Sequence, residues 1–320
     1  MNPFRVSLAS WTLWGGVCGG ILLGGLSPSA AEEYLAPGAQ GEKAVSGCRF
    51  TEGPALDADG NLYFSDGPND RIMRRSPDGT VSIFRQPCGQ TNGMKFDAEG
   101  RLVMCQSAGA KGKRRVARIE VDGKEIVLAE AYEGKKLNAP NDLTIAVNGR
   151  IYFTDMAPPN ATNLELPSAV YRIDAPGQVV RVIDNLGRPN GIVLTPDNKT
   201  LYVSDRAEQK LHRYDVAADG SLSNDSVVYD FSPDRGIDGM CLDAEGNIVA
   251  AAGQGATTGL FVVSPQGKLL LHKPVPEFAT NVCFAGEDFR ELFITASTSV
   301  YRFKTVKPGQ KPLVMLQKSK

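Results

Sequence analysis

A short pattern recurs six times along this chain of 320 residues, at intervals of 40 to 49 residues. Each copy opens with a side chain that carries an oxygen, continues into an apolar run and turns at a polar, glycine-rich tetrad such as Asp57-Ala58-Asp59-Gly60. The six opening residues are Glu52, Asn92, Asn141, Asn190, Asp238 and Thr280. This repeat is the strongest constraint on the fold, because each unit has to pack against its neighbours.

The residues between successive openings predict four strands per unit. In the first unit a hairpin joins 52–57 to 62–65, and two further strand-like runs follow at 71–75 and 81–84. Four strands in a unit of this length are typical of a propeller blade. The sequence therefore predicts an all-β, six-bladed β-propeller. The alternative is an ordinary β-sandwich whose strands resemble one another by accident.

The first 31 residues have the composition of an export signal. Arg5 is their only charge, Val6 to Leu26 are uncharged, and Ser29-Ala30-Ala31 offers small residues for cleavage. We expect a cleaved signal peptide and export to the periplasm or the extracellular space. The alternative is a retained membrane anchor, because 21 uncharged residues are long enough to span a bilayer.

The rest of the chain divides into two segments. Residues 32–41 are rich in Ala, Pro, Gly and Glu, which predicts an N-terminal tether. Residues 42–320 form the predicted propeller domain. The formal net charge of −1 gives no basic surface for nucleic acid, and we expect a monomer or weak dimer that does not bind membranes once the signal is removed.

Histidine and cysteine chemistry is not indicated. His212 and His272 are the only histidines, and both fall outside the opening positions, which excludes a histidine general base there. No CxxC spacing exists, so a zinc site is not predicted. A disulfide between Cys48 and Cys88, which lie near adjacent blade openings, is an alternative to free thiols.

The opening positions predict the functional site. The first strand of every propeller blade lines the central channel, so the six openings converge on one axis. Glu52, Asn141, Asn190 and Asp238 bring only hard oxygen donors and a charge of −2. Two unpaired carboxylates in a partly buried channel repel each other unless a cation neutralises them. Oxygen-only ligation favours Ca²⁺ or Mg²⁺, and Ca²⁺ is preferred because it accepts irregular shells.

Other polar residues are weaker candidates for substrate contact. Asn92 and Thr280 occupy the remaining openings, where they either touch bound water or substrate or pack the channel mouth. Asp66, Gln106 and Asp155 end second strands that return to the same face. They either recognise the hydroxyls of a polyol or cap the next loop. Asp205 ends or follows an equivalent strand and is the weaker candidate for hydroxyl recognition.

The chain resembles the family of senescence marker protein (regucalcin), gluconolactonase and luciferin-regenerating enzyme. The resemblance covers residues 45–305, and its sharpest motifs are Phe50-Thr51-Glu52-Gly53-Pro54, Ala139-Pro140-Asn141-Asp142-Leu143, Arg188-Pro189-Asn190-Gly191-Ile192 and Ile237-Asp238-Gly239-Met240-Cys241-Leu242-Asp243-Ala244-Glu245-Gly246. It implies a six-bladed propeller that hydrolyses sugar lactones with a divalent metal. The implied ligands are Glu52, Asn141, Asn190 and Asp238, with Asp238 also the general base. Ala139 stands where the animal lactonases have an arginine for sugar recognition, so the lactone is not specified.

We therefore expect an exported metal-dependent lactonase, with the cation as Lewis acid and Asp238 accepting a proton from water. Calcium is the expected cation, with Mg²⁺, Mn²⁺ and Zn²⁺ as alternatives. Two other functions remain open. One is organophosphate triester hydrolysis at the same site, and the other is a non-enzymatic propeller in which calcium only staples the channel.

Overall fold

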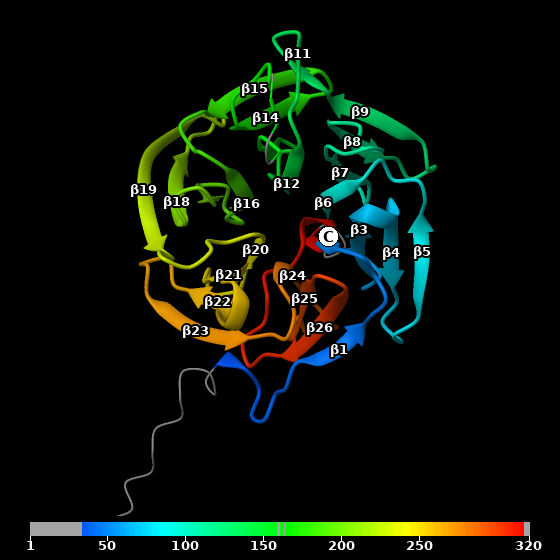
Figure 1. Ribbon diagram of the computed structural model, residues 1–320, viewed down its shortest axis with the longest axis vertical. Coiled ribbons are helices and arrows are strands. Elements are labelled where there is room, and N and C mark those ends of the chain that lie inside the picture. Colours follow the sequence, from blue (N-terminus) through cyan, green and yellow to red (C-terminus); the bar gives the residue numbers. More distant parts are fainter. Residues whose placement is uncertain (1–33, 159–160, 163, 317–320) are drawn as a thin grey trace, which may run out of the picture.

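The computed structural model describes residues 34–158, 161–162 and 164–316 and shows six four-stranded antiparallel sheets in a ring (Figure 1). The prediction of an all-β, six-bladed propeller is confirmed. The segment predicted to direct export lies outside the described residues. Within them, no helix is both long and apolar enough to cross a membrane.

The blades follow one another along the chain, and in each the first strand lies nearest the axis (Figure 1). Their strands are β2 (Thr51–Leu56), β3 (Leu62–Asp66), β4 (Arg71–Arg75) and β5 (Val81–Arg85) in blade 1; β6 (Thr91–Phe96), β7 (Leu102–Gln106), β8 (Arg115–Ile119) and β9 (Glu125–Ala129) in blade 2; β12 (Pro140–Ile145), β13 (Ile151–Asp155), β14 (Ala169–Ala175) and β15 (Gln178–Ile183) in blade 3. Blade 4 has β16 (Pro189–Leu194), β17 (Thr200–Asp205), β18 (Lys210–Val216) and β19 (Leu222–Asp230); blade 5 has β20 (Met240–Leu242), β21 (Ile248–Ala252), β22 (Gly259–Val263) and β23 (Leu269–Pro274). Blade 6 has β24 (Ala279–Ala285), β25 (Glu291–Ala296), β26 (Ser299–Lys304) and β1 (Glu42–Val45). A small hairpin of β10 (Ala131–Tyr132) and β11 (Lys135–Lys136) follows blade 2, and short 3₁₀ turns lie at η1 (Gly67–Asn69) and η2 (Gly255–Thr257).

The polar tetrads end the inner strands as predicted, through side-chain bonds to the backbone. In blade 1 one carboxylate oxygen of Asp57 accepts the N–H groups of Asp59 and Asn61, each at 2.9 Å. In blade 5 Asp243 accepts the N–H groups of Glu245 and Asn247 in the same way. Such Asx turns reverse the chain within a few residues and fix where each hairpin turns.

The hydrophobic core lies between the faces of adjacent blades. The strands β3, β7, β13 and β21 are buried along their whole length, because both of their faces are covered by neighbouring blades. Phe64, Phe153 and Phe293, in the middle of second strands, are at most 1% exposed. This continuous packing holds the six inner strands at fixed positions around the axis.

The N-terminal strand closes the ring. β1 pairs with β26 in antiparallel register, Glu42 opposite Arg302, so the outermost strand of blade 6 comes from the other end of the chain. The sequence left open which terminal segment completes this blade. The structure assigns that place to β1.

The segment predicted as a tether packs against the ring where it is described. Tyr34 and Leu35 are 3% and 4% exposed, and the Tyr34 hydroxyl donates to Asp243 at 3.2 Å. Leu35 also forms an isolated antiparallel bridge with Thr305. The apolar Tyr34-Leu35 pair thus differs from the rest of the Ala-, Pro- and Gly-rich stretch, and it anchors the chain before β1.

The C-terminal segment lies at the other end of the channel from the strand openings. Gln310 donates its backbone N–H to Leu242 at the end of β20, and α2 (Leu313–Leu316) follows. In Figure 1 this segment, in red, lies near the centre of the ring.

The alternative of a Cys48–Cys88 disulfide is not realised. Both cysteines are buried free thiols, like Cys105, and Cys241 and Cys283 are free and partly exposed. The thiols therefore act as small packing groups in the described part of the chain.

Glu277 holds the closed blade together. Its carboxylate accepts from Lys43 of β1 and from Thr298, Ser299 and Tyr301 of blade 6, at 2.6 to 3.0 Å. Burial acts to raise the pKa of Glu277, but the hydrogen bonds outweigh it and lower the pKa to about 2. The Glu277 carboxylate thus accepts hydrogen bonds both from the N-terminal strand β1 and from the last strands of the propeller.

Replacing Glu277 with Ala is expected to lower the free energy of unfolding at pH 7 by about 1 to 3 kcal/mol, because several donors lose a charged acceptor. Since the pKa of Glu277 is lower in the folded state, its stabilisation is complete above about pH 4.5 and is lost as the pH falls towards 2. Urea unfolding at several pH values measures both effects. The exposed Glu287→Ala is the control. Equal stability of the two variants at pH 7 would contradict the assigned role.

Candidate functional site

The channel has two chemically different ends. All six inner strands start at one end, which we call the mouth, and finish at the other with apolar residues such as Leu56, Phe96 and Leu242. The predicted donors lie at the mouth, because each sits in the first positions of its strand or just before it. The sequence repeat therefore placed them on one face of the molecule.

Glu52, Asn190 and Asp238 converge at the mouth. All three are at most 5% exposed, and the Asn190 amide donates from Nδ2 to Oδ1 of Asp238 at 2.7 Å. The carboxylate of Glu52 accepts the N–H of Gly53 at 2.5 Å. Asn141 takes the equivalent place at the second position of β12 and is partly exposed.

Arginine side chains supply charges that the repeat did not reveal. The Arg235 guanidinium donates to Oδ2 of Asp238 at 2.8 Å and to the carbonyl oxygens of Gly253 and Ala279. It also lies over the ring of Phe278, 4.0 Å from the centroid. These contacts fix Arg235, which in turn orients Asp238. Arg206 approaches the same carboxylate oxygen at 3.5 Å.

Asp142 and Asn281 fill the channel just below the mouth. They are 2% and 1% exposed, and Asn281 Nδ2 lies 3.1 Å from Oε2 of Glu52 and 3.4 Å from Oδ2 of Asp142. In sequence, each follows an opening residue, in a column otherwise occupied by glycine. Sequence reasoning assigned Thr280 rather than Asn281 to the ring and missed Asp142. The departure of these two residues from a glycine column was the available signal.

The glycine column lets adjacent inner strands touch. A Cβ on Gly53 would lie 2.1 Å from the carbonyl oxygen of Asn92, and one on Gly191 would lie 2.6 Å from that of Asp238. Gly93 and Gly239 face the side chains of Asp142 and Asn281, with hypothetical Cβ distances of 2.5 and 2.0 Å. Side chains therefore fit at this level only where the neighbouring strand has none.

Glu52 is a buried carboxyl group among negative neighbours. Burial raises the pKa of Glu52 well above its usual range, and the charges of Asp238 and Asp142 raise it further. Burial likewise raises the pKa of Asp142, although Lys95 opposes that shift. Within the described residues no Lys, Arg or His forms an ion pair with Glu52. Its carboxylate therefore lacks the positive partner that Asp238 has.

The two remaining openings differ from each other. Thr280 is fully buried, and its hydroxyl bonds to backbone and side-chain oxygens of Thr51 and Thr295, so it packs the inner strands together. Asn92 is partly exposed, yet its Oδ1 is buried and has no hydrogen-bond partner among the described residues. Of the two, Asn92 has an acceptor free at the mouth.

The residues at the ends of the second strands make loop-capping contacts. Asp66, Gln106 and Asp155 are fully buried. Asp66 accepts backbone N–H groups of Arg49 and Phe50, and Asp155 accepts two further backbone N–H groups at 2.6 and 2.8 Å. Gln106 donates to a backbone carbonyl at 3.0 Å. The bonds of Asp66 and Asp155 hold the segment that leads into the first strand of the same blade, and Asp205 does the same for Gly187 and Arg188.

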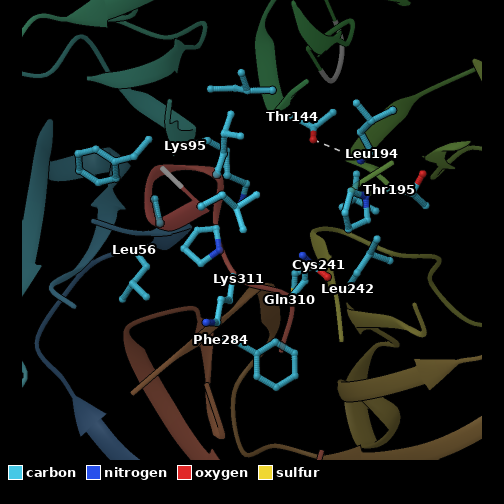
Figure 2. Close-up of a pocket in the computed structure, with 18 of the residues that line it drawn as sticks. Leu56, Lys95, Thr144, Leu194, Thr195, Cys241, Leu242, Phe284, Gln310 and Lys311 are labelled. Carbon is cyan, nitrogen blue, oxygen red and sulfur yellow. Dashed lines mark hydrogen bonds between the residues drawn. The ribbon is translucent and has the colours of Figure 1, made fainter. Parts of the chain in front are cut away.

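The opposite end of the channel holds a cavity of about 170 Å³ (Figure 2). It is lined by Lys95, Thr144, Cys241 and Cys283 and, from the C-terminal segment, by Gln310, Lys311, Pro312, Leu313 and Leu316. Burial raises the pKa of both thiols, so they are not nucleophilic thiolates at neutral pH. The chemistry of the channel is therefore concentrated at the mouth.

The mouth fits a hard divalent cation through mixed donors. In the part of the chain that the structure describes, no group of three or more His, Cys, Asp and Glu side chains is arranged to hold a metal. The candidate set instead combines the carboxylates of Glu52 and Asp238 with the amide oxygens of Asn141 and Asn190. Two observations suit a cation that is ligated by oxygen. Glu52 is buried without a cationic partner, and the Oδ1 of Asn92 is buried without a hydrogen bond.

Fold and site together define a class: six-bladed propellers with an oxygen-lined, carboxylate-bearing channel mouth. Residues 50–298 match the model of the SMP-30/Gluconolactonase/LRE-like region, and the chain belongs to this family. The Zymomonas mobilis protein named gluconolactonase is 32% identical over 296 residues, covering 82% of this chain and 81% of that protein. Rabbit (Oryctolagus cuniculus) regucalcin is 27% identical over 261 residues, covering 78% and 84%. A solved gluconolactonase of Xanthomonas campestris is 32% identical with a TM-score of 0.77, covering 87% and 93%.

Introducing Ala at Gly239 is expected to destabilise the fold by about 1 to 3 kcal/mol, because its Cβ overlaps Cγ of Asn281. Adding Asn281→Ala removes the overlapping atoms and should restore part of the loss. Denaturant unfolding of the single and double variants measures this coupling. Gly67→Ala, where a Cβ meets no atom within 4 Å, is the control. Strict additivity of the two changes would contradict the steric account.

The stability of chelator-treated protein is expected to fall with rising pH through Glu52. Its pKa is about 8 in the folded state against 4.5 ordinarily, so unfolding releases a proton between these values. The free energy of unfolding should therefore decrease, relative to Glu52→Gln, by at most about 1.4 kcal/mol per pH unit in this window. Thermal melts from pH 5 to pH 8 compare the two proteins, with Glu287→Gln as control. Parallel profiles would show that Glu52 is not the strained carboxyl.

Proposed function

We propose that the chain is a metal-dependent lactonase that opens a sugar lactone at the channel mouth. The convergence of Glu52, Asn190 and Asp238, with two carboxylates and only one of them paired to arginine, carries this proposal. Membership of the family and the relatives named gluconolactonase support a lactone ester as the substrate class.

Glu52, Asn141, Asn190 and Asp238 would hold the divalent cation, calcium by preference because all four donors are oxygens. When bound, such an ion supplies Lewis-acid polarisation of the ester carbonyl. Glu52 then binds as a carboxylate, because positive charge beside it lowers the cost of its ionisation.

Asp238 is the proton acceptor in this proposal. Asn190 holds Oδ1 and Arg235 holds Oδ2, so the carboxylate faces the channel in one orientation. Asp238 takes a proton from water as the water oxygen bonds to the carbonyl carbon. The ring C–O bond then breaks and the leaving oxygen takes up the proton, which gives the open hydroxy acid.

Turnover of glucono-1,5-lactone, measured as acid release with and without chelator, tests the reaction class. A phosphotriester substrate in the same assay tests the alternative hydrolase. A protein that turns over neither substrate under several divalent metals would be the binding propeller. Export by residues 1–31 stays part of the proposal and is tested by the N-terminus of the mature protein.

Asp238→Asn and Asn190→Ala are expected to separate catalyst from ligand. Asp238→Asn keeps an oxygen of the same size but loses the base, so turnover should fall about 10² to 10⁴-fold even at saturating metal. Asn190→Ala loses one neutral donor, which water replaces, so excess metal should restore part of the activity. Steady-state rates across a metal titration measure both. Full rescue of Asp238→Asn by metal would reduce Asp238 to a ligand.

A further inference from the structure

Two guanidinium groups approach one carboxylate on the blade 4 and blade 5 side of the mouth, and a third arginine, Arg188, is bonded to one of them through the backbone. Arg235 and Arg206 both approach Oδ2 of Asp238, at 2.8 and 3.5 Å. Arg188 directly precedes β16, and its carbonyl oxygen accepts the backbone N–H of Arg206 at 3.0 Å. Asp238, itself a predicted metal ligand, is the carboxylate that Arg235 and Arg206 share. The carboxylate of Asp205 accepts the backbone N–H of Arg188 at 2.9 Å, and the Arg188 guanidinium makes no ion pair within the described residues.

Arg188 differs from the other two arginines in its partners. Arg235 is bound on every side, and Arg206 pairs with Asp238. Arg188 is partly buried, its Nε is buried without a hydrogen-bond partner, and it makes no ion pair within the described residues. A half-buried guanidinium beside another cation is costly unless an anion neutralises it.

The position of Arg188 connects it to the reaction site. It stands two residues before Asn190, next to the first position of β16. Burial lowers the pKa of Arg188, the charge of Arg206 lowers it further, and the charge of Asp238 opposes the shift. A group bound to Arg188 and Arg206 therefore lies beside the donors of the mouth but is held by different residues. Guanidinium groups bind phosphate and carboxylate oxygens in bidentate fashion.

We propose that Arg188, with Arg206, forms an anion subsite, so that the preferred lactone carries a second acidic group, a phosphate or a carboxylate, beside the ester ring. This inference rests on the proposed lactonase function and narrows its substrate class. A neutral sugar lactone leaves Arg188 without a partner. An acidic one supplies the missing counter-charge and orients the ring at the mouth.

The test compares kcat/KM for glucono-1,5-lactone, its 6-phosphate and the 1,4-lactone of glucaric acid. The wild type is expected to favour an acidic lactone by about 10-fold or more, the range of a charge-assisted hydrogen bond. Arg188→Gln should reduce that ratio by a similar factor and Arg188→Lys by less. Arg213→Gln, on β18 of the same blade and paired with Asp215, is the matched control. The two acidic substrates distinguish phosphate from carboxylate.

Two results would overturn the subsite. One is no preference for either acidic lactone, and the other is an equal fall for neutral and acidic lactones in Arg188→Gln, which places Arg188 at the ester. If no lactone is opened, the proposed function fails, and calorimetry with 6-phosphogluconate against gluconate then decides the subsite alone. Tighter binding of the phosphate that weakens about 10-fold in Arg188→Gln supports it. Equal affinities refute it.

Discussion

Direct contact between neighbouring inner strands sets the width of the channel, and the site depends on it. At Gly53 and Gly191 the backbone of one blade touches the backbone of the next opening residue. The ring is therefore narrow, and polar side chains from different blades come within hydrogen-bond distance of one another. The core between the blades keeps the channel narrow, because the second strands are fully packed and the inner strands cannot move outward. Tight strand contact and converging donors are thus two results of the same packing.

Narrowness also creates the electrostatic character of the mouth. Glu52, Asp142 and Asp238 are all buried, and the three carboxyl groups have different partners. Asp238 has Arg235, Asp142 has the charge of Lys95 nearby, and Glu52 has only neutral donors. The negative charge of Glu52 has no positive partner, which favours binding of a cation there. On the blade 4 and blade 5 side, the arginines outnumber their carboxylate partner, which favours binding of an anion. A substrate that bridges a metal and a guanidinium pair would satisfy both sides at once.

The register of the repeat determines which parts of the site could be predicted from the sequence. Glu52, Asn190 and Asp238 could be found because equivalent positions in successive blades must share an axis. Asp142 was missed because it lies one residue after the opening position of its blade. Arg206 and Arg235 lie in loops outside the repeated strands. No periodicity in the sequence indicates where such side chains point, so their contacts with Asp238 could be seen only in the structure. Likewise, four residues of β1 carry too little pattern to reveal that they close the last blade.

The pairing of β1 with β26 has a consequence for how the protein is made. During synthesis, β1 must wait for a partner that leaves the ribosome about 260 residues later, as the separation of Glu42 and Arg302 shows. Until then the nascent chain holds an incomplete ring, and β1 remains an unpaired strand of the kind that recruits foreign strands. Contacts so distant in sequence also slow folding. Closure of the ring is therefore a late step, and a chain cut short before blade 6 leaves β1 as an unpaired strand that is open to aggregation.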